Sequence, residues 1–243
     1  MALELIEPDW PAPSSVRAVM TTRHGGVSVG PYATMNLGDH VGDDAASVAA
    51  NRRRLVDELG AVPCWLSQVH GTDVVDLAEA ADGVVADAAV SRIPGRACTV
   101  MTADCLPVLF CDRAGTVVAA AHAGWRGLCA GVLEATVRAM GVDPGSVLAW
   151  LGAAIGPAAF EVGEEVRTAF MAQGEAAARA FRSAPDGGKW FADLYALARW
   201  RLARGGVTAV YGGGLCTHSD ADRFFSYRRT PVTGRMASLV WLR

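Results

Sequence analysis

ACTVMTADCLPVLFCDRAGTVVAAAHAGWRG, residues 97–127, is the stretch of the chain that most clearly predicts its fold. Three apolar runs with the length and composition of β-strands lie in it, at residues 97–102, 106–111 and 116–121. The Asp-Arg-Ala-Gly sequence at 112–115 predicts a hairpin turn between the last two runs. After the glycines at 124 and 127, the apolar residues follow a helical pattern that ends at Gly141, so the stretch predicts strands followed by a helix.

The rest of the chain continues this alternation of strands and helices. Further strands are predicted over residues 16–22, 64–69, 82–85, 147–152, 207–211 and 236–242. Further helices are predicted from Asp43 or Asp44 to Gly60, from about Gly163, and over residues 192–204. With no linker and no repeat between these elements, we expect one domain over residues 1–243, built from mixed sheets with helices outside.

Composition and charge exclude several classes of protein. Of the 243 residues, 51% are hydrophobic and 19% are charged, which is enough apolar material for a sizeable core. The net charge is −3 and the basic residues are scattered, which argues against binding nucleic acid. The N-terminus lacks the pattern of a signal peptide and no apolar run is long enough to span a membrane, so we expect a cytoplasmic protein. None of the six cysteines forms a C-x-x-C pair, so a zinc knuckle or a disulfide framework is not expected.

Three probable strands end near a side chain that can bind a metal ion. These side chains are His70, Cys105 and His122. Two imidazoles and one thiolate form a three-ligand zinc set that leaves a fourth position for water or substrate, and such an open site supports catalysis. The spacing alone fits equally well with a buried thiol and two histidines that are satisfied by hydrogen bonds.

Glycine-containing loops and one arginine are candidates for binding a polar ligand. The loops at 23–26 and 36–38 offer Arg23 and Asn36 as hydrogen-bonding groups, although the same residue types also serve tight turns. At 122–127, a strand leads into a helix whose first N–H groups, with Arg126, favour an anion such as phosphate; a tight turn with a surface arginine is an equal alternative. The segment 224–229 has the residues to stack on an aromatic ligand, but a core patch with exposed arginines is the commoner arrangement.

The motifs around these residues resemble one family when they are taken in order. They are TTRHGGVS at 21–28, NLG at 36–38, QVHG at 68–71, TADCLP at 102–107, HAGWRG at 122–127, GAAIGP at 152–157, FSYRR at 225–229 and TGR at 233–235. The sequence closely resembles the multicopper polyphenol oxidase or laccase-domain family, whose members are also called purine nucleoside phosphorylase-like or peptidoglycan editing factor proteins. The resemblance covers almost the whole chain.

The resemblance implies a fold, a metal site and an activity. The fold would be α+β, a layered α/β/β/α sandwich similar to that of cysteine-hydrolase-like toxins. His70, Cys105 and His122 would hold zinc and act as the catalytic residues. The activity would be phosphorolysis of adenosine, inosine and methylthioadenosine, with adenosine deamination as a second reaction. Arg23, Asn36 and Arg126 would contact the nucleoside or phosphate, in a monomer or small homo-oligomer.

Other functions stay open from the sequence. A four-copper laccase needs many imidazoles, and the chain has five histidines in total, so copper is expected only as an alternative occupant of the zinc site. A metal-free Cys–His amidohydrolase acting on a cell-wall precursor that carries a wrong amino acid would use the same three residues, with Cys105 as the nucleophile. A binding protein with a structural metal would need a fourth ligand, for which Asp104 or Cys98 are the first candidates.

Overall fold

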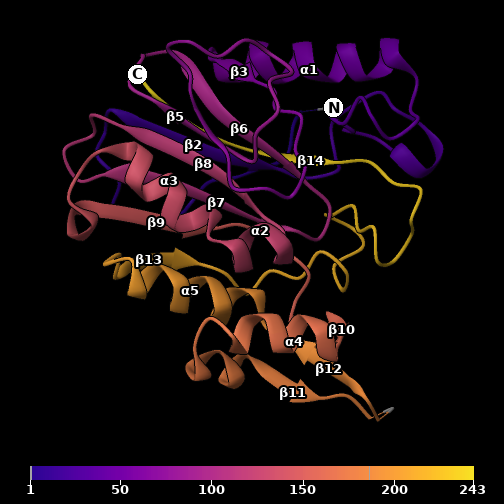
Figure 1. Cartoon of the computed structure of the whole chain (residues 1–243). Coiled ribbons are helices and arrows are strands. Elements are labelled where there is room, and N and C mark those ends of the chain that lie inside the picture. The colour runs from indigo at the N-terminus through magenta and orange to yellow at the C-terminus, as the bar shows by residue number, and fades with distance from the viewer. Residues whose placement is uncertain (1, 186) are drawn as a thin grey trace.

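Strands β7 (Leu106–Asp112) and β8 (Val118–Ala123) form an antiparallel hairpin in the middle of the structure, as the sequence predicts. The structure is a computed structural model that describes residues 2–185 and 187–243 (Figure 1). All residues of both strands are buried, because each strand has a packed layer on both of its faces. The hairpin therefore belongs to an inner layer of the protein.

Two mixed sheets build the centre of the protein. The six-stranded sheet has the order β13-β9-β7-β8-β5-β4, and the five-stranded sheet has the order β1-β2-β14-β6-β3. The remaining strands of the first sheet are β4 (Val74–Asp76), β5 (Ala88–Ser91), β9 (Val147–Leu151) and β13 (Ala209–Gly212). Those of the second are β1 (Leu5–Ile6), β2 (Val16–Thr21), β3 (Val62–Cys64), β6 (Arg96–Thr102) and β14 (Met236–Leu242). Each sheet contains both parallel and antiparallel neighbours.

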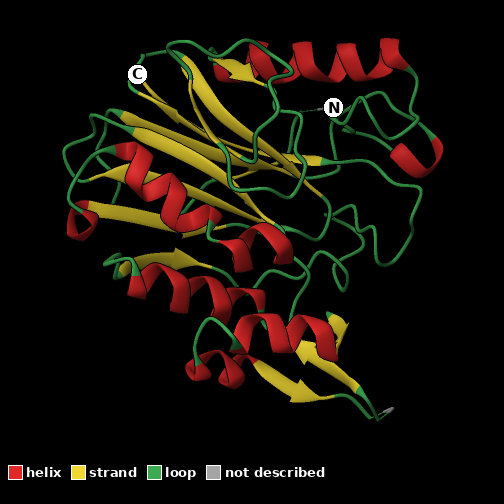
Figure 2. Cartoon of the chain, viewed as in Figure 1, coloured by secondary structure: helices red, strands yellow, loops and turns green. Residues whose placement is uncertain are grey.

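Helices cover the outer face of each sheet (Figure 2). The helices are α1 (Ala45–Leu59), α2 (Trp125–Ala130), α3 (Val132–Met140), α4 (Glu164–Met171) and α5 (Leu194–Arg204), with short 3₁₀ turns at Gly30–Tyr32, Pro144–Ser146 and Glu175–Ala180. Leu55 of α1 packs on the five-stranded sheet, while Leu133 of α3 and Leu197 of α5 pack on the six-stranded sheet. A third core cluster lies between the sheets and includes Val100 and Leu109. The predicted α/β/β/α sandwich is thus confirmed.

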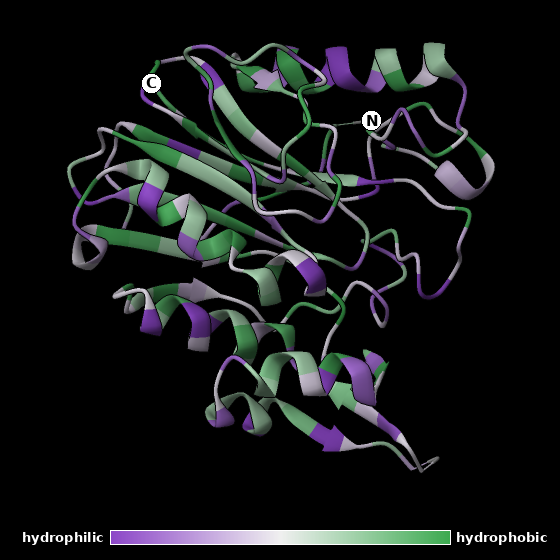
Figure 3. Cartoon of the chain, in the orientation of Figure 1, coloured by the Kyte–Doolittle hydropathy of each residue, from purple (hydrophilic) through white to green (hydrophobic). Residues whose placement is uncertain are grey.

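The hydropathy pattern explains this layering. In Figure 3 the strands of the two central sheets are largely hydrophobic, whereas α1 and α5 alternate hydrophobic and hydrophilic turns. A strand that is apolar on both faces must be covered on both sides, and an amphipathic helix buries only one stripe. The sequence therefore places the strands in the middle and the helices outside.

A small lobe extends the layer formed by α5. Its sheet has the order β10-β12-β11, with β10 at Glu161–Gly163, β12 at Lys189–Ala192 and β11 at Phe181–Ser183. It carries α4 and lies beside α5 in Figure 1. Phe170 and Phe181 of the lobe belong to the same core cluster as Leu197 of α5, so the lobe shares apolar packing with the main body.

Capping residues set the ends of two predicted helices. Asp44 caps α1 by accepting the N–H of Ser47, and Gly60 ends the helix in a left-handed conformation at φ 63°. Asp193 caps α5 in the same way, so this helix begins at Leu194, two residues after the predicted start.

Other predictions of local structure are wrong. The predicted helix after His122 is divided at Gly131, whose φ of 107° interrupts the helical backbone between α2 and α3. The predicted strand at 64–69 is instead β3, which ends at Cys64; Ser67 makes only an isolated bridge with Val85. The predicted strand at 82–85 is absent from the described residues, and the chain enters the sheet later, in β5.

Candidate active site

The three candidate metal ligands lie together in the structure. Cys105 immediately precedes β7, and His122 lies in β8, where it pairs across the hairpin with Pro107. His70 comes from the loop that follows β3. The ligand atoms of the three side chains lie within 4.8 Å of one another, and Sγ of Cys105 is 3.7 Å from Nε2 of His70. We call these residues the His-Cys-His trio; two imidazoles and a thiolate at these separations could hold a zinc ion.

A buried carboxylate orients both histidines of the trio. Asp87 is fully buried, and its Oδ1 lies 2.8 Å from Nδ1 of His122 and accepts the N–H of His70 at 2.9 Å. Its Oδ2 accepts the N–H groups of Val69 at 3.1 Å and Gly71 at 2.6 Å. A carboxylate in this setting accepts, so Nδ1 of His122 carries a proton, and Nε2 is the atom that would bind a metal ion once its own proton is displaced. One side chain thereby holds the loop that carries His70 and fixes the tautomer of His122.

The backbone at the site takes conformations that few residues adopt. His70 has a φ of 62° and Asp104 a φ of 90°, and both are left-handed values in residues other than glycine. The contacts of Asp87 hold the first of these residues. The second is held through its own carboxylate, which accepts Oγ1–H of Thr217 at 2.6 Å and the N–H of Arg228 at 2.7 Å. Tertiary contacts thus impose local backbone strain at His70 itself and at the residue before Cys105.

The electrostatics of the trio favour an ionised thiol. Burial alone would raise the pKa of the Cys105 thiol. The contacts with the rings of His122 and His70 together outweigh burial, so the pKa is lowered to about 6. Burial lowers the pKa of His122, whereas Cys105 and Asp87 raise it, to about 9. A thiolate is the form of cysteine that binds metals and attacks electrophiles. The site therefore presents a reactive sulfur at neutral pH.

Two glycines of the HAGWRG motif permit close packing against the trio. A Cβ at Gly124 would lie 2.6 Å from Cδ2 of His70 and 3.0 Å from Sγ of Cys105. A Cβ at Gly127 would lie 2.8 Å from the carbonyl oxygen of Gly71. Any side chain at these positions would displace the trio or its supporting loop, so the motif has a steric explanation.

The trio opens into a cavity of about 540 Å³. Besides the trio, this active-site cavity is lined by His40, Gln68, Met101, Thr102, Ala103, Asp104, Trp125, Arg126, Ile155, Phe160, Tyr227, Arg228 and Arg235. Three of these are arginines. The guanidinium of Arg126 lies over the ring of Trp125, and Arg228 donates to the carbonyl of Glu161 at 2.8 Å. A cavity with three guanidinium groups and aromatic walls suits an anion together with a flat ring.

Arg126 is the one predicted substrate contact that lines this cavity. Arg23 lies over the ring of Phe225 and donates to the carbonyls of Ala33 and Ala221, so its guanidinium supports the fold. Asn36 is fully buried, and its amide bonds Gly38, Asp43 and the N–H of Arg235. Both residues therefore lie outside the lining of the cavity, because the loop at 23–26 bonds to residues 34 and 35 and to Arg223, and the loop at 36–38 bonds to Arg235.

The other candidates from the sequence have structural surroundings. Cys98 is fully buried in the core between the sheets, where burial raises its pKa. The carboxylate of Asp104 accepts hydrogen bonds from Thr217 and Arg228. Among the described residues, the group placed to hold a metal ion consists of the trio and does not include Asp104. Phe224 and Phe225 are core residues, whereas Tyr227 is 55% exposed and lines the cavity.

Several residues of the site carry no signal in the sequence. Asp87 is separated from His122 by 35 positions, and no motif marks it. His40 is an isolated histidine in the sequence, yet it lines the cavity. Gln68 lies in the QVHG motif, and its side chain bonds both the N–H and the carbonyl of Met101, at 2.7 and 2.8 Å. Its place in that motif, two residues before His70, is the signal that could have singled it out.

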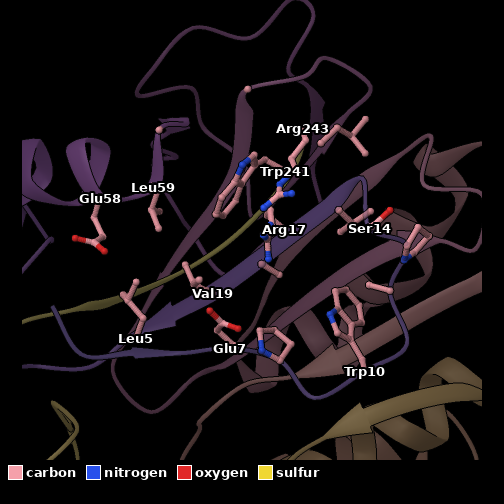
Figure 4. Close-up of a pocket in the computed structure, with 18 residues that line it drawn as sticks. Leu5, Glu7, Trp10, Ser14, Arg17, Val19, Glu58, Leu59, Trp241 and Arg243 are labelled. Atoms are coloured by element: carbon pink, nitrogen blue, oxygen red, sulfur yellow. The ribbon is translucent and has the colours of Figure 1, made fainter.

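A separate cavity of about 680 Å³ lies beside the N-terminal segment and contains none of the trio. Figure 4 shows its lining, with Trp10, Arg17 and Trp241 among the labelled side chains. Arg17 and Trp241 are paired across β2 and β14, so this cavity lies on the five-stranded sheet.

None of the described helices is long and apolar enough to cross a membrane.

Comparison with known proteins connects this geometry to a family. The sequence model of the multi-copper polyphenol oxidoreductase laccase family matches residues 17–243. A Pseudomonas aeruginosa protein named a purine nucleoside phosphorylase is 60% identical over 237 residues, covering 98% of both chains. An Escherichia coli protein of the same name is 57% identical over 242 residues, covering 98% of this chain and 99% of the relative. The crystal structure of a Neisseria meningitidis protein matches with a TM-score of 0.96 at 54% identity, over 98% of both chains.

Proposed function

Because the chain belongs to the multi-copper polyphenol oxidoreductase laccase family, whose similar members are named purine nucleoside phosphorylases, we propose that it is a zinc-dependent purine nucleoside phosphorylase. Its substrates would be adenosine, inosine and methylthioadenosine with phosphate, and its products the free base and the sugar 1-phosphate. Adenosine deamination would be a second reaction. The observation that carries this proposal is the active-site cavity itself, where an open ligand trio and three arginines share one lining.

The trio fits zinc by its chemistry. His70, Cys105 and His122 supply two nitrogens and a sulfur, and Asp87 gives His122 the carboxylate partner that metal-binding histidines usually have. When bound, zinc would supply Lewis-acid polarisation of a substrate atom. Copper would compete for the same ligands, because nitrogen and sulfur sites generally bind Cu²⁺ more tightly than Zn²⁺.

The arginines are the groups suited to hold phosphate. We assign this role to Arg126 and Arg228, whose guanidinium groups line the cavity from α2 and from the segment after β13. Guanidinium binds phosphate oxygens in pairs, which positions the nucleophile and offsets its charge. The chain would thus act mainly by orienting phosphate and nucleoside against each other.

A second candidate is a metal-free amidohydrolase acting on a mis-aminoacylated cell-wall precursor. It is favoured by the order Cys105, His122, Asp87, in which a thiol with a lowered pKa, an imidazole and a buried carboxylate form a nucleophile–base–orienter series. The same residues serve the zinc proposal, since a ligand thiolate and a nucleophilic thiolate require similar surroundings.

The laccase activity in the family's name receives less support from this chain. A multi-copper oxidase needs many imidazoles, and two of the five histidines are in the trio. Of the others, His24 lies near Glu4 and Asp222, away from the cavity lining. The single trio among the described residues suits one metal ion rather than a copper cluster.

The deciding experiment is a substrate screen on protein of known metal content. Adenosine and inosine are incubated with and without phosphate, and base release is measured by chromatography. We expect about one zinc per chain and base release that requires phosphate. Phosphate-independent amide cleavage by zinc-free protein, with covalent capture of Cys105, would support the hydrolase instead. Phenol oxidation after adding copper, without base release, would support the oxidase.

A further inference from the structure

A second cavity adjoins the active-site cavity. It has a volume of about 530 Å³, and His40, Gln68 and Met101 line both cavities, so the two are neighbouring compartments with these residues at their boundary. We call it the second compartment. Its own lining includes Asp39, Arg52, Trp65 and Asp82. One cavity of ordinary size already suits a small ligand, so two adjoining compartments suit a substrate with an extension.

The second compartment offers charges of both signs beside an aromatic ring. The guanidinium of Arg52 lies 4.2 Å from the ring centre of Trp65 and 3.2 Å from Oδ2 of Asp39. Asp39 is 61% exposed, and Asp82 is also exposed, with its Oδ1 accepting the N–H of Trp65 at 3.2 Å. The Arg52 side chain is only 20% exposed, and its Nε donates to the carbonyl of Leu37 at 3.0 Å, so its guanidinium is held in place. Contacts of exposed carboxylates contribute little energy, so Asp39 and Asp82 can turn toward a ligand's ammonium group while Arg52 faces its carboxylate.

The two compartments lie toward opposite layers of the sandwich. Arg126 belongs to α2, in the helix layer outside the six-stranded sheet (Figure 1). Arg52 belongs to α1, in the helix layer outside the five-stranded sheet, and Trp65 immediately follows β3, the edge strand of that sheet. The trio lies between these two ends, since Cys105 and His122 flank and occupy strands of the hairpin. The cavity thus runs from the end that carries Arg126 to an end of mixed charge, and Arg235, which packs against Gly38, lies near the second of these ends.

The stereochemistry of phosphorolysis relates these ends to the parts of a substrate. The base and the 5′ carbon of a nucleoside project from the same face of the ribose, and in an in-line displacement phosphate attacks C1′ from the opposite face. If Arg126 and Arg228 hold phosphate, the 5′ substituent points away from them, toward His40, Gln68 and Met101. That wall is where the second compartment begins.

We propose that the second compartment binds the zwitterionic amino-acid tail of a 5′-substituted purine nucleoside, with Asp39 and Asp82 facing the ammonium group and Arg52 facing the carboxylate. This inference rests on the proposed phosphorolysis and names its substrate class. In the reaction, a phosphate oxygen bonds to C1′ as the C1′–N9 bond breaks. The base leaves with the bonding electron pair and the proton of hydrogen phosphate, and the tail stays on the sugar 1-phosphate.

The test compares two 5′-thioethers of adenosine, S-adenosylhomocysteine and methylthioadenosine, which differ only in the group on sulfur. Dissociation constants are measured by calorimetry and kcat/KM with phosphate on zinc-loaded protein. We expect S-adenosylhomocysteine to bind roughly tenfold more tightly, as two partly exposed charge contacts allow. The double variant Asp39→Asn, Asp82→Asn should bring the ratio of the two dissociation constants close to one. Asp57→Asn, an exposed carboxylate on α1 outside both cavities, is the control and should keep the ratio.

The outcomes separate this inference from the function on which it rests. If methylthioadenosine is phosphorolysed and S-adenosylhomocysteine binds no more tightly, the compartment does not recognise the tail. If neither is phosphorolysed but the affinity ratio and its loss are observed, the phosphorylase proposal fails and the tail site stands. Should the double variant misfold, an analogue of S-adenosylhomocysteine without the α-amino group replaces it. Unchanged affinity for that analogue in the wild-type protein would also overturn the inference.

Discussion

Nδ1 of His122 lies 2.8 Å from Oδ1 of Asp87, and both side chains are buried. The same carboxylate accepts the N–H of His70, so two members of the trio depend on one residue that binds no metal itself. Burial alone would raise the pKa of Asp87. The hydrogen bonds from His122 and the backbone N–H groups outweigh burial, so the pKa lies below its ordinary value and the carboxylate stays ionised. Asp87 therefore sets the positions of the two histidines of the trio.

The first prediction concerns Asp87→Asn. The Asn side chain has one oxygen that accepts and one NH₂ that donates, whereas Asp87 accepts at two oxygens. The variant therefore loses either the hydrogen bonds to the loop that carries His70 or the one to Nδ1 of His122. We expect zinc affinity to fall about 10-fold to 100-fold, measured by competition with a chelator. Asp57→Asn, an exposed carboxylate on α1, should leave the affinity unchanged. Equal zinc affinities of the Asp87 variant and the wild-type protein would show that the trio is held by other contacts.

The second prediction concerns Gly124→Ala. The added methyl group would lie 2.6 Å from Cδ2 of His70, closer than carbon atoms approach without displacement. We expect zinc affinity to fall roughly tenfold or more, with little change in secondary structure by circular dichroism. Gly187→Ala is the control, because a Cβ there meets nothing within 4 Å. If the Gly124 variant binds zinc as tightly as the wild-type protein, the loop that carries His70 can move away from the methyl group without weakening the metal site.

The third prediction concerns pH and uses Asp112, at the turn of the central hairpin. Its carboxylate accepts the N–H groups of Thr116 and Val117 at 2.7 and 3.0 Å and Oγ1–H of Thr116 at 2.8 Å. Burial alone would raise the pKa of Asp112, but these hydrogen bonds outweigh burial, so the pKa lies below its ordinary value. Because the folded-state pKa lies below the unfolded value of about 3.9, the stabilisation is present above pH 4 and lost as the pH falls.

Asp112→Asn should therefore lower the free energy of unfolding by about 1–3 kcal/mol at pH 7. Urea unfolding followed at pH 7, 5, 4 and 3 should show the difference from the wild-type protein shrinking between pH 4 and pH 3. A difference that stays constant over this range would mean that shape rather than ionisation of the side chain matters.

The central hairpin could be predicted because its signals are local: the apolar runs that form β7 and β8 are long and separated by turn residues, and Cys105 and His122 stand at their ends. His70 instead lies in a loop, next to residues 64–69 for which the sequence predicts a strand, and the spacing alone does not decide whether the three side chains meet. Gly131 was harder to interpret, since a glycine inside a helical pattern is tolerated in many helices. The strands of the lobe are three or four residues long, too short for periodicity to be recognised.

The surroundings of the trio could not be predicted because they depend on tertiary contacts. Asp87 approaches His70 only when β5 and the loop after β3 come together, and a lone aspartate gives no sign of this. Arg23 and Arg228 both lie within motifs that carry the family resemblance, TTRHGGVS and FSYRR, yet the first supports a loop and the second lines the cavity. Which arginine contacts a ligand is decided by how the loops pack, not by the residues next to it.

The last prediction separates these two kinds of arginine. Arg126→Ala and Arg228→Ala should each raise KM for phosphate roughly 10-fold to 100-fold, because each removes a charge-assisted hydrogen bond. Arg23→Ala should instead lower the free energy of unfolding by about 1–3 kcal/mol, since it deprives the carbonyls of Ala33 and Ala221 of a donor. Phosphate saturation curves and urea unfolding on all three variants test this. If Arg23→Ala changes KM for phosphate while its stability is normal, the sequence motif identifies the ligand contact better than the cavity lining does, and the phosphate site must include the loop at 23–26.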